Sequence, residues 1–390
     1  MWKLLLSALL SCLFLFPFAN PAWRNERTTT ETLTAYIRTD HLPPEDYVIS
    51  KFKDHDVVFL GEFHRIRHDV EFVQNLIPRL YQAGVFTLAI EFARREDQPL
   101  IDQLLNGATY DESLARQIAF NQYVFWGYQE YVDIYKAAWK LNQQLPKNKR
   151  RFRILGVNCS PDWSLVQKQE DLENNPEVMT KVWRGCGETQ WGKVILDEVV
   201  AKGEKALVYS GMHHAFTQYR QPLYNTATHG FAGFGDVRMG NYVYNAIGKR
   251  AITICLHAVW ISSEGYDAPD VYAADGYIDA AMAKVAPAIT RVGFDTIGTP
   301  FGDLPGTTSI YKYGYKDFVL STFCDGYIYQ GPLSAYEGVT PIKDFINEAN
   351  LATAQAQAPN PKFRHASAEE FNRAIAADTD MQRRLAPLLH

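Results

Sequence analysis

Two Gly-x-x-His motifs stand at the ends of apolar runs that have the composition of buried strands. Residues 57–64 read VVFLGEFH, and residues 206–214 read ALVYSGMHH. In an open parallel sheet the carboxyl ends of the strands face one crevice, so side chains far apart in sequence can meet there. The motifs therefore predict a site that contains two imidazoles and at least one carboxylate.

Glu62 and His64 are the first residues of this predicted site. On an extended segment, residues i and i+2 point to the same side, so the carboxylate and the imidazole can share the crevice. Such a pair suits metal ligation or general acid–base chemistry. His68 follows His64 by four residues, and the two imidazoles would share one face if a helix begins here. The alternative is structural: Glu62 caps the following helix and the histidines pack against it.

Glu91 ends the apolar run of residues 88–91. An acid at the end of a buried strand is costly unless it has a partner or meets solvent in a crevice. Arg94 and Arg95 are near enough in sequence to pair with it. We therefore expect a functional carboxylate where the strand gives way to a loop, with a purely structural ion pair as the alternative.

The second motif offers two adjacent histidines. Neighbouring strand residues face opposite sides, so one of them is expected in the site, and the register of the motif selects His214, with His213 as the fallback. In the glycine-rich segment 225–241, Arg238 is expected either to orient an anionic substrate or to salt-bridge an acid. His229 is expected to be a solvated loop residue at the border of the pocket. His257, within a strand, is expected to be a hydrogen-bonded core histidine.

Apolar runs alternate with helical segments between residues 50 and 260. The candidate strands are residues 56–60, 87–91, 152–157, 206–210 and 251–257. Apolar residues between positions 70 and 80 recur at helical spacing, and a long helical region over residues 128–141 precedes the third strand. This alternation predicts an α/β fold with a largely parallel sheet and helices on both faces.

Beyond residue 257 Gly, Pro, Asp and Tyr become frequent, which predicts a loop-rich C-terminal extension of the same domain. Residues 318–322 and 326–330 are candidate strands through which the sheet continues. Residues 349–363 are rich in Ala, Gln, Pro and Asn and are expected to form a linker or tail. A final short helix is expected over residues 368–388.

The N-terminus indicates export to the periplasm or cell envelope. Lys3 precedes an apolar run that reaches Phe18, which is typical of a signal peptide and short for a membrane span. Cys12 lies in a lipobox-like context, so a lipid on Cys12 is one alternative link to a membrane. An uncleaved N-terminal anchor is another. We expect a signal peptide over residues 1–22, an α/β domain over 23–348, and a C-terminal linker with a short helix over 349–390.

The net charge and the cysteine content limit which partners and covalent cofactors the chain can have. The net charge of -5 gives no global attraction to nucleic acid. Export permits a disulfide between Cys159, Cys186, Cys255 and Cys324, but their spacing leaves the pairing open. Cys255 and Cys324 lie in apolar runs and are expected to be buried free thiols. No Cys-x-x-Cys-His motif occurs, which excludes covalent attachment of a c-type haem.

Three segments together resemble the ChaN-like family of the haem-binding uptake and Tiki superfamily. They are residues 61–74, which hold Glu62, His64, His68 and Gln74, residues 90–107 (IEFARREDQPLIDQLLNG), and the aromatic-rich residues 126–135. The spacing of Glu91, Gln98-Pro99, Ile101-Asp102 and Gly107 is the most specific part. Residues 236–258 are similar to a wider group of relatives, the erythromycin-esterase-like proteins.

The resemblance implies two classes of function. ChaN-like proteins are associated with haem binding and iron uptake at the bacterial envelope, which implies an exported haem-binding or iron-binding protein. Haem ligation would need a tyrosine or histidine at the rim of a pocket, and Tyr219 and Tyr224 are the candidates.

The second class is hydrolysis. Tiki-type members are metal-dependent proteases, and their pattern implies a divalent metal held by His64, Glu91 and His214, with Glu62 as general base and Arg95, Arg238 and His68 toward a small-molecule or peptide substrate. Esterase-like relatives imply a variant without a metal, in which His64 is the base. Their Glu and His are separated by one more residue than Glu62 and His64 are.

Overall fold

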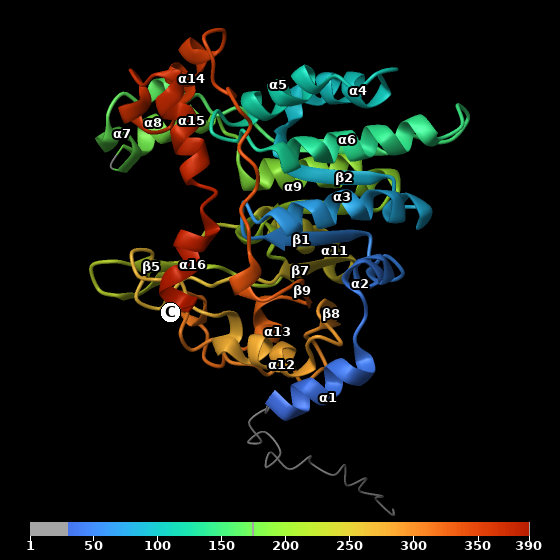
Figure 1. The fold of residues 1–390 in the computed structure, drawn as a ribbon. Coiled ribbons are helices and arrows are strands. Elements are labelled where there is room, and N and C mark those ends of the chain that lie inside the picture. The colour runs from blue at the N-terminus through green and yellow to red at the C-terminus, as the bar shows by residue number, and fades with distance from the viewer. Residues whose placement is uncertain (1–29, 174, 390) are drawn as a thin grey trace, which may run out of the picture.

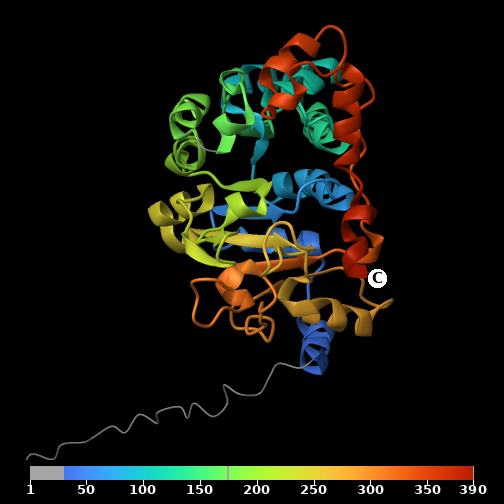
Figure 2. The same cartoon turned by 90° about the vertical axis from the view of Figure 1, so that its left-hand side faces the viewer.

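A seven-stranded sheet with helices on both faces organises the chain, which the computed structural model describes over residues 30–173 and 175–389 (Figure 1, Figure 2). Its order is β3-β2-β4-β1-β7-β9-β8, and every neighbouring pair is parallel except β8 with β9. The strands are β1 (Val57–Glu62), β2 (Thr87–Arg94), β3 (Arg153–Asn158), β4 (Ala206–Gly211), β7 (Ala251–Leu256), β8 (Val292–Asp295) and β9 (Gly326–Tyr329). The predicted α/β class and the largely parallel sheet are confirmed.

In the described part of the chain, two helices precede the first strand, and the others lie in the intervals between the strands and after the last one. Those of the first half are α1 (Thr30–Asp40), α2 (Pro44–Lys51), α3 (Arg67–Gln82), α4 (Gln98–Asn106), α5 (Glu112–Gln122), α6 (Gln129–Gln144), α7 (Gln169–Glu173), α8 (Pro176–Trp183) and α9 (Glu188–Glu198). Those of the second half are α10 (Met212–Ala215), α11 (Met239–Ile247), α12 (Tyr277–Val285), α13 (Leu320–Phe323), α14 (Leu351–Gln357), α15 (Ala368–Ala377) and α16 (Met381–Leu389).

The alternation of side chains along β1 shows why both faces of the sheet are covered. Val58 and Leu60 pack in the core that includes the apolar faces of α3 and α6. Val57 and Phe59 point the other way, into the core that includes residues of α9 and α11. Full burial of each such side chain contributes roughly 2 kcal/mol, so a strand that is apolar at every position is stable only between two layers of helices.

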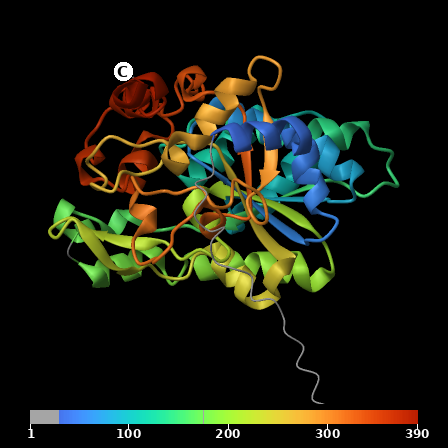
Figure 3. The ribbon, with the colours of Figure 1, turned by 90° about the horizontal axis from the view of Figure 1, so that it is seen from below.

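A small antiparallel hairpin leaves the main sheet after α10. It consists of β5 (Pro222–Asn225) and β6 (Gly230–Phe234). It projects to the left in Figure 1, and seen from below it again lies away from the main sheet (Figure 3).

Two expectations for the C-terminal third are wrong. Residues 318–322 are not a strand: α13 lies there, and the backbone N–H groups of Leu320 and Ser321 donate to the loop carbonyls of Leu304 and Gly302. Residues 349–363 are not a linker, because α14 lies there and buries Ala354 in the main core. The expected strand over residues 326–330 is confirmed by β9.

The predicted final helix over residues 368–388 is interrupted, and it forms as the pair α15 and α16. The segment from α14 to α16 runs along one side of the molecule (Figure 1, Figure 2). The boundary placed at residue 348 stays a prediction.

The predicted signal peptide and the lipobox cysteine, Cys12, lie outside the described residues. Between residues 30 and 389, leaving out residue 174, none of the helices combines the length and the apolar character that crossing a bilayer requires. Cys159 and Cys186 form a disulfide, and the prediction that Cys255 and Cys324 are buried free thiols is confirmed.

Candidate functional site

The carboxyl ends of β1, β2 and β4 bring the predicted histidines and acids together. The three strands are neighbours in the sheet, and Glu62 at the end of β1 is in register with Gly211 at the end of β4. A Cβ atom added to Gly211 would lie 2.6 Å from Cε1 of His64 and 3.4 Å from Cδ2 of His214. The two rings therefore flank the same backbone position, and a side chain there would displace the ring of His64.

Glu62 is buried at the centre of a hydrogen-bond cluster. Its carboxylate accepts from the hydroxyl groups of Tyr131, on α6, and Tyr209, on β4. Burial raises the pKa of both tyrosines well above the usual value, and the nearby charge of Glu62 adds to this, so both hydroxyls keep their protons and donate. The alternative in which Glu62 caps the next helix is wrong, because the N-cap of α3 is Ile66 and has no side-chain cap.

His64 is held by Glu62 and by aromatic rings. Its Nδ1 lies 2.8 Å from a carboxylate oxygen of Glu62, and its ring packs edge-on against Phe92 and Trp126. A carboxylate only accepts hydrogen bonds, so the imidazole donates from Nδ1 and its Nε2 carries the lone pair. One third of the His64 side chain is exposed, which leaves it accessible to a reactant. This arrangement is that of an oriented general base.

His214 lies between two carboxylates. Its Nε2 is 3.3 Å from Glu91 and its Nδ1 is 2.6 Å from Glu188. Burial lowers the pKa of His214, but the charges and hydrogen bonds of Glu91 and Glu188 outweigh burial and raise the pKa to about 10. For Glu91 burial acts in the opposite direction and alone would raise the pKa, but His214 and the N–H of Gly211 lower the pKa to about 2. The three groups therefore form a carboxylate–imidazolium–carboxylate array at neutral pH.

The expectation that Arg94 or Arg95 pairs with Glu91 is wrong. Arg94 makes two hydrogen bonds to Asp97, and Arg95 pairs with Glu198 at 2.7 Å. The imidazole of His214 is the partner that offsets the burial of Glu91.

Glu188 is a member of the cluster that the sequence did not suggest. It is the first residue of α9, and its carboxylate accepts from the guanidinium of Arg238 at 2.9 Å and from the N–H of Met239 at 2.9 Å. Arg238 also donates to Gln221 at 3.0 Å. Of the two roles expected for Arg238, the structure has the ion pair with an acid.

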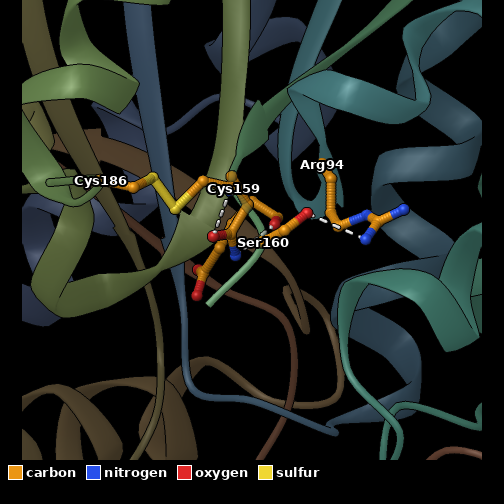
Figure 4. The surroundings of a disulfide bond; sticks show 6 residues. Arg94, Cys159, Ser160 and Cys186 are labelled. Atoms are coloured by element: carbon orange, nitrogen blue, oxygen red, sulfur yellow. Dashed lines mark hydrogen bonds between the residues drawn. A yellow bond between two sulfur atoms is a disulfide. The ribbon is translucent and has the colours of Figure 1, made fainter. Parts of the chain in front are cut away.

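A disulfide attaches the segment before Glu188 to the sheet. Cys186, two residues before Glu188, is bonded to Cys159, which directly follows β3 (Figure 4). The residue before Cys159 is Asn158, whose side-chain amide donates to the main-chain oxygen of Glu91 at 3.0 Å. The bond therefore joins the segment that leads to Glu188 to the end of β3, which in turn contacts the main chain of Glu91 on β2.

Figure 4 also shows the guanidinium of Arg94 beside Ser160, to which it donates at 2.9 Å. This contact fixes the end of β2 against the residues after β3.

Two tryptophan side chains flank the imidazoles. Trp126 packs against His64, and Trp191 packs against His214 with ring centroids 5.0 Å apart. Both indoles are buried, and neither N–H has a hydrogen-bond partner within residues 30–173 and 175–389. A buried donor without a partner is uncommon. Because both nitrogens are buried, the indoles contribute packing surface beside the imidazoles.

The remaining predicted histidines lie elsewhere. His68 is in a separate buried group, beside Asp69 and against Tyr336. His213 turns away from the cluster to the hydroxyl of Tyr311, because β4 ends at Gly211 and both histidines lie on the short helix α10 rather than on a strand.

His257 is buried between Tyr327 and Asp279, with a contact on each ring nitrogen, as expected for a core histidine.

The divalent metal expected on His64, Glu91 and His214 finds no support in this arrangement. No group of three or more His, Cys, Asp or Glu side chains in the described ranges is disposed to hold a metal ion. Both ring nitrogens of His214 face carboxylates, whereas a metal ligand needs a neutral imidazole with a free lone pair.

The tyrosines named as haem ligands differ in access. The hydroxyl of Tyr219 is buried and donates to the carbonyl of Tyr311. Tyr224, on the β5–β6 hairpin, is partly exposed and donates to the carbonyl of Glu264.

Residues 48–176 match the family described as "Haem-binding uptake, Tiki superfamily, ChaN". No curated protein matches the chain. Three solved structures are similar to it at low identity. A Bacillus cereus protein has 11% identity, covers 80% of this chain and 99% of its own, with a TM-score of 0.46. A succinoglycan biosynthesis protein has 11% identity, the same two coverages and a TM-score of 0.49. ChaN of Campylobacter jejuni, described with cofacial haem, has 15% identity, covers 58% of this chain and 90% of its own, with a TM-score of 0.36.

Proposed function

We propose that the protein is exported and binds haem in an uptake-type role at the cell envelope, because residues 48–176 match the family described as haem-binding uptake, Tiki superfamily, ChaN. The family match is the observation that carries this proposal. It agrees with the resemblance that the motifs around Glu62, His64 and Glu91 indicated.

The chain has exposed side chains of the kinds that ligate haem iron and cover the macrocycle. Haem iron in proteins is ligated by the side chains of His, Tyr, Cys or Met, and the macrocycle needs an apolar or aromatic surface against it. The chain has accessible candidates of both kinds: Tyr224 is partly exposed, and Phe231, Phe234 and Tyr266 are each more than 40% exposed. When bound, haem would supply iron as the cargo of uptake, and the side chains of the protein would hold and cover it.

Two observations support export. Residues 1–22 have the pattern of a signal peptide, and Cys159 is joined to Cys186. Disulfides form and persist in oxidising compartments such as the bacterial periplasm. A fusion of residues 1–22 to alkaline phosphatase, which is active only after export, should show activity, and deletion of residues 1–22 should abolish it. Equal activity of both fusions would contradict export.

Titration of the purified protein with haemin tests the main proposal. We expect a Soret band that saturates at a fixed stoichiometry with a dissociation constant in the micromolar range or below, which corresponds to about 8 kcal/mol of binding free energy. Metal analysis of the same sample excludes a metal carried from expression. If the spectrum at every ratio is identical to that of haemin in the same buffer without protein, the proposal is contradicted.

Acid–base hydrolysis is the second candidate, and the contact between Glu62 and His64 favours it. His64 is oriented by Glu62 and is one-third exposed, so it has the arrangement needed to activate water on an ester or amide. The reaction would use no metal in this form. Hydrolysis of p-nitrophenyl acetate should fall about 100-fold in His64→Gln and stay unchanged in His365→Gln, which alters an exposed histidine near the C-terminus. Equal rates in both variants would contradict it.

A further inference from the structure

The β5–β6 hairpin exposes an unusual amount of apolar surface. The large apolar side chains among the described residues that are more than 40% exposed include four on or beside it: Leu223 at 47%, Phe231 at 44%, Phe234 at 41% and Tyr266 at 57%. Contiguous apolar surface of this kind commonly marks a binding site. The hairpin begins one residue after Gln221, which contacts Arg238, so this surface adjoins the carboxylate–imidazole cluster.

The aromatic rings of this surface are in contact with one another. Phe231 packs against Phe234, whose ring contacts Tyr315. Tyr224 stacks on Tyr313 with ring centroids 6.2 Å apart, and it packs edge-on against Tyr266. The loop before Tyr315 approaches the hairpin at Gly314, where a Cβ atom would lie 2.7 Å from both phenylalanine rings. The rings therefore form two groups, which are linked through the pairing of Tyr224 with Phe231 across the hairpin, and we call both groups together the hairpin face.

His229 stands at the turn of the hairpin, and its hydrogen bond sets its tautomer. Its Nδ1 lies 3.0 Å from the hydroxyl of Tyr224, and that hydroxyl lies 2.7 Å from the carbonyl oxygen of Glu264. A carbonyl only accepts, so the single proton of the hydroxyl goes to Glu264, and the imidazole donates from Nδ1. The lone pair is then on Nε2 of an exposed side chain. A histidine whose second nitrogen is fixed in this way has the arrangement found in metal-ligating imidazoles.

We propose that Nε2 of His229 is the axial ligand of a haem that binds on the hairpin face. The inference rests on the proposed haem-binding function and assigns it a place. The aromatic rings supply the apolar contact for the macrocycle, and Tyr224 orients the ligand. His229 is exposed in a turn, as expected from the sequence, and its contact with Tyr224 is what the sequence does not show.

Charge on this side of the molecule suits the two propionates of haem. The ammonium of Lys312 lies 5.7 Å from the ring of Tyr313, next to the stacked tyrosines. Arg220 and Lys316, in the segments that flank the rings, are exposed. A planar apolar molecule that carries carboxylates is therefore the occupant that this combination of rings, imidazole and cations recognises.

Haemin titration of His229→Ala tests the placement. The full chain after signal removal is titrated, with wild type beside it and His365→Ala as a control for loss of an exposed histidine. We expect the wild type to show the spectrum of imidazole-ligated iron. His229→Ala should bind at least about tenfold more weakly and lose that spectrum, and free imidazole added to the variant should restore it. A merely structural role for His229 would give no such rescue.

Two further variants separate the ligand from the surface. Phe234→Ala should weaken binding while the ligand spectrum stays, because it removes contact area only. Tyr224→Phe should reduce affinity about tenfold, as loss of the group that orients a ligand does.

The outcomes separate this inference from the proposed function. If the wild type binds haem and His229→Ala binds with unchanged affinity and spectrum, the placement is overturned and haem binding stands. If the wild type gives no saturable binding, the proposed function fails, and the placement with it.

Discussion

The substitution Glu91→Gln tests whether the carboxylate–imidazolium array stabilises the fold. Glu91 is 12% exposed and its pKa is about 2, against a usual value of 4.5. A difference of this size corresponds to about 3 kcal/mol, since one pKa unit equals roughly 1.4 kcal/mol. The glutamine keeps the size of the side chain and its contact with the N–H of Gly211. The loss therefore reports the interaction of Glu91 with His214, both its charge and its hydrogen bond.

The stabilisation by the ionised Glu91 depends on pH in a direction that its pKa determines. The pKa of Glu91 is lower in the folded protein than in the unfolded chain, so its stabilisation is fully present above pH 4.5 and is lost as the pH falls through 2. The difference between wild type and Glu91→Gln should shrink from about 3 kcal/mol at pH 7 to about 1 kcal/mol at pH 3. The pKa of His214 moves further than that of Glu91, because His214 also contacts Glu188, and that contact survives the substitution.

Urea unfolding at pH 7 and pH 3, followed by tryptophan fluorescence and circular dichroism, measures both differences. Glu369→Gln is the matched control, because Glu369 is an exposed helix residue paired with Arg373, and its loss should cost no more than about 0.5 kcal/mol. A loss below about 1 kcal/mol for Glu91→Gln at pH 7, or a larger loss at pH 3 than at pH 7, would refute the reasoning.

Two other substitutions address the rest of the cluster. Tyr131→Phe removes a donor to a buried carboxylate and should cost about 2 kcal/mol in urea unfolding, whereas Tyr135→Phe, which removes a buried hydroxyl without a partner among the described residues, should be neutral or stabilising. Equal losses in the two variants would contradict the assigned hydrogen bond. Gly211→Ala should displace His64 and change its imidazole resonances, because the added methyl would lie 2.6 Å from Cε1, while Gly331→Ala, which has open space, should leave them unchanged.

The parts of the site that lie at strand ends could be predicted from the sequence. The run that leads to Glu62 is apolar throughout, and the run that leads to His213 and His214 is interrupted only by Ser210, which places both in a doubly covered parallel sheet. The carboxyl ends of neighbouring strands then must meet, whatever the loops do. Thus the juxtaposition of His64 with His214 followed from pattern and topology.

Other features depend on contacts between distant segments. Glu188 begins a helix that follows no strand, so no periodic pattern marked it as part of the cluster. Tyr131 has the spacing of a core residue of α6, and only the packing of α6 on the sheet brings its hydroxyl to Glu62. Residues 349–363 have a composition shared by linkers and short helices, and the burial of Ala354 and Ala358 decided for the helix.

The disulfide has a consequence for proteolysis. Residues 160–185 lie between the two bonded cysteines, so a protease that cuts within them produces two chains that remain covalently joined. Glu188 would stay tied to the end of β3 and therefore in place beside His214. Nicked protein would migrate as one species without reductant and as two fragments with it, and its haem titration and unfolding would match those of the intact chain until the bond is reduced.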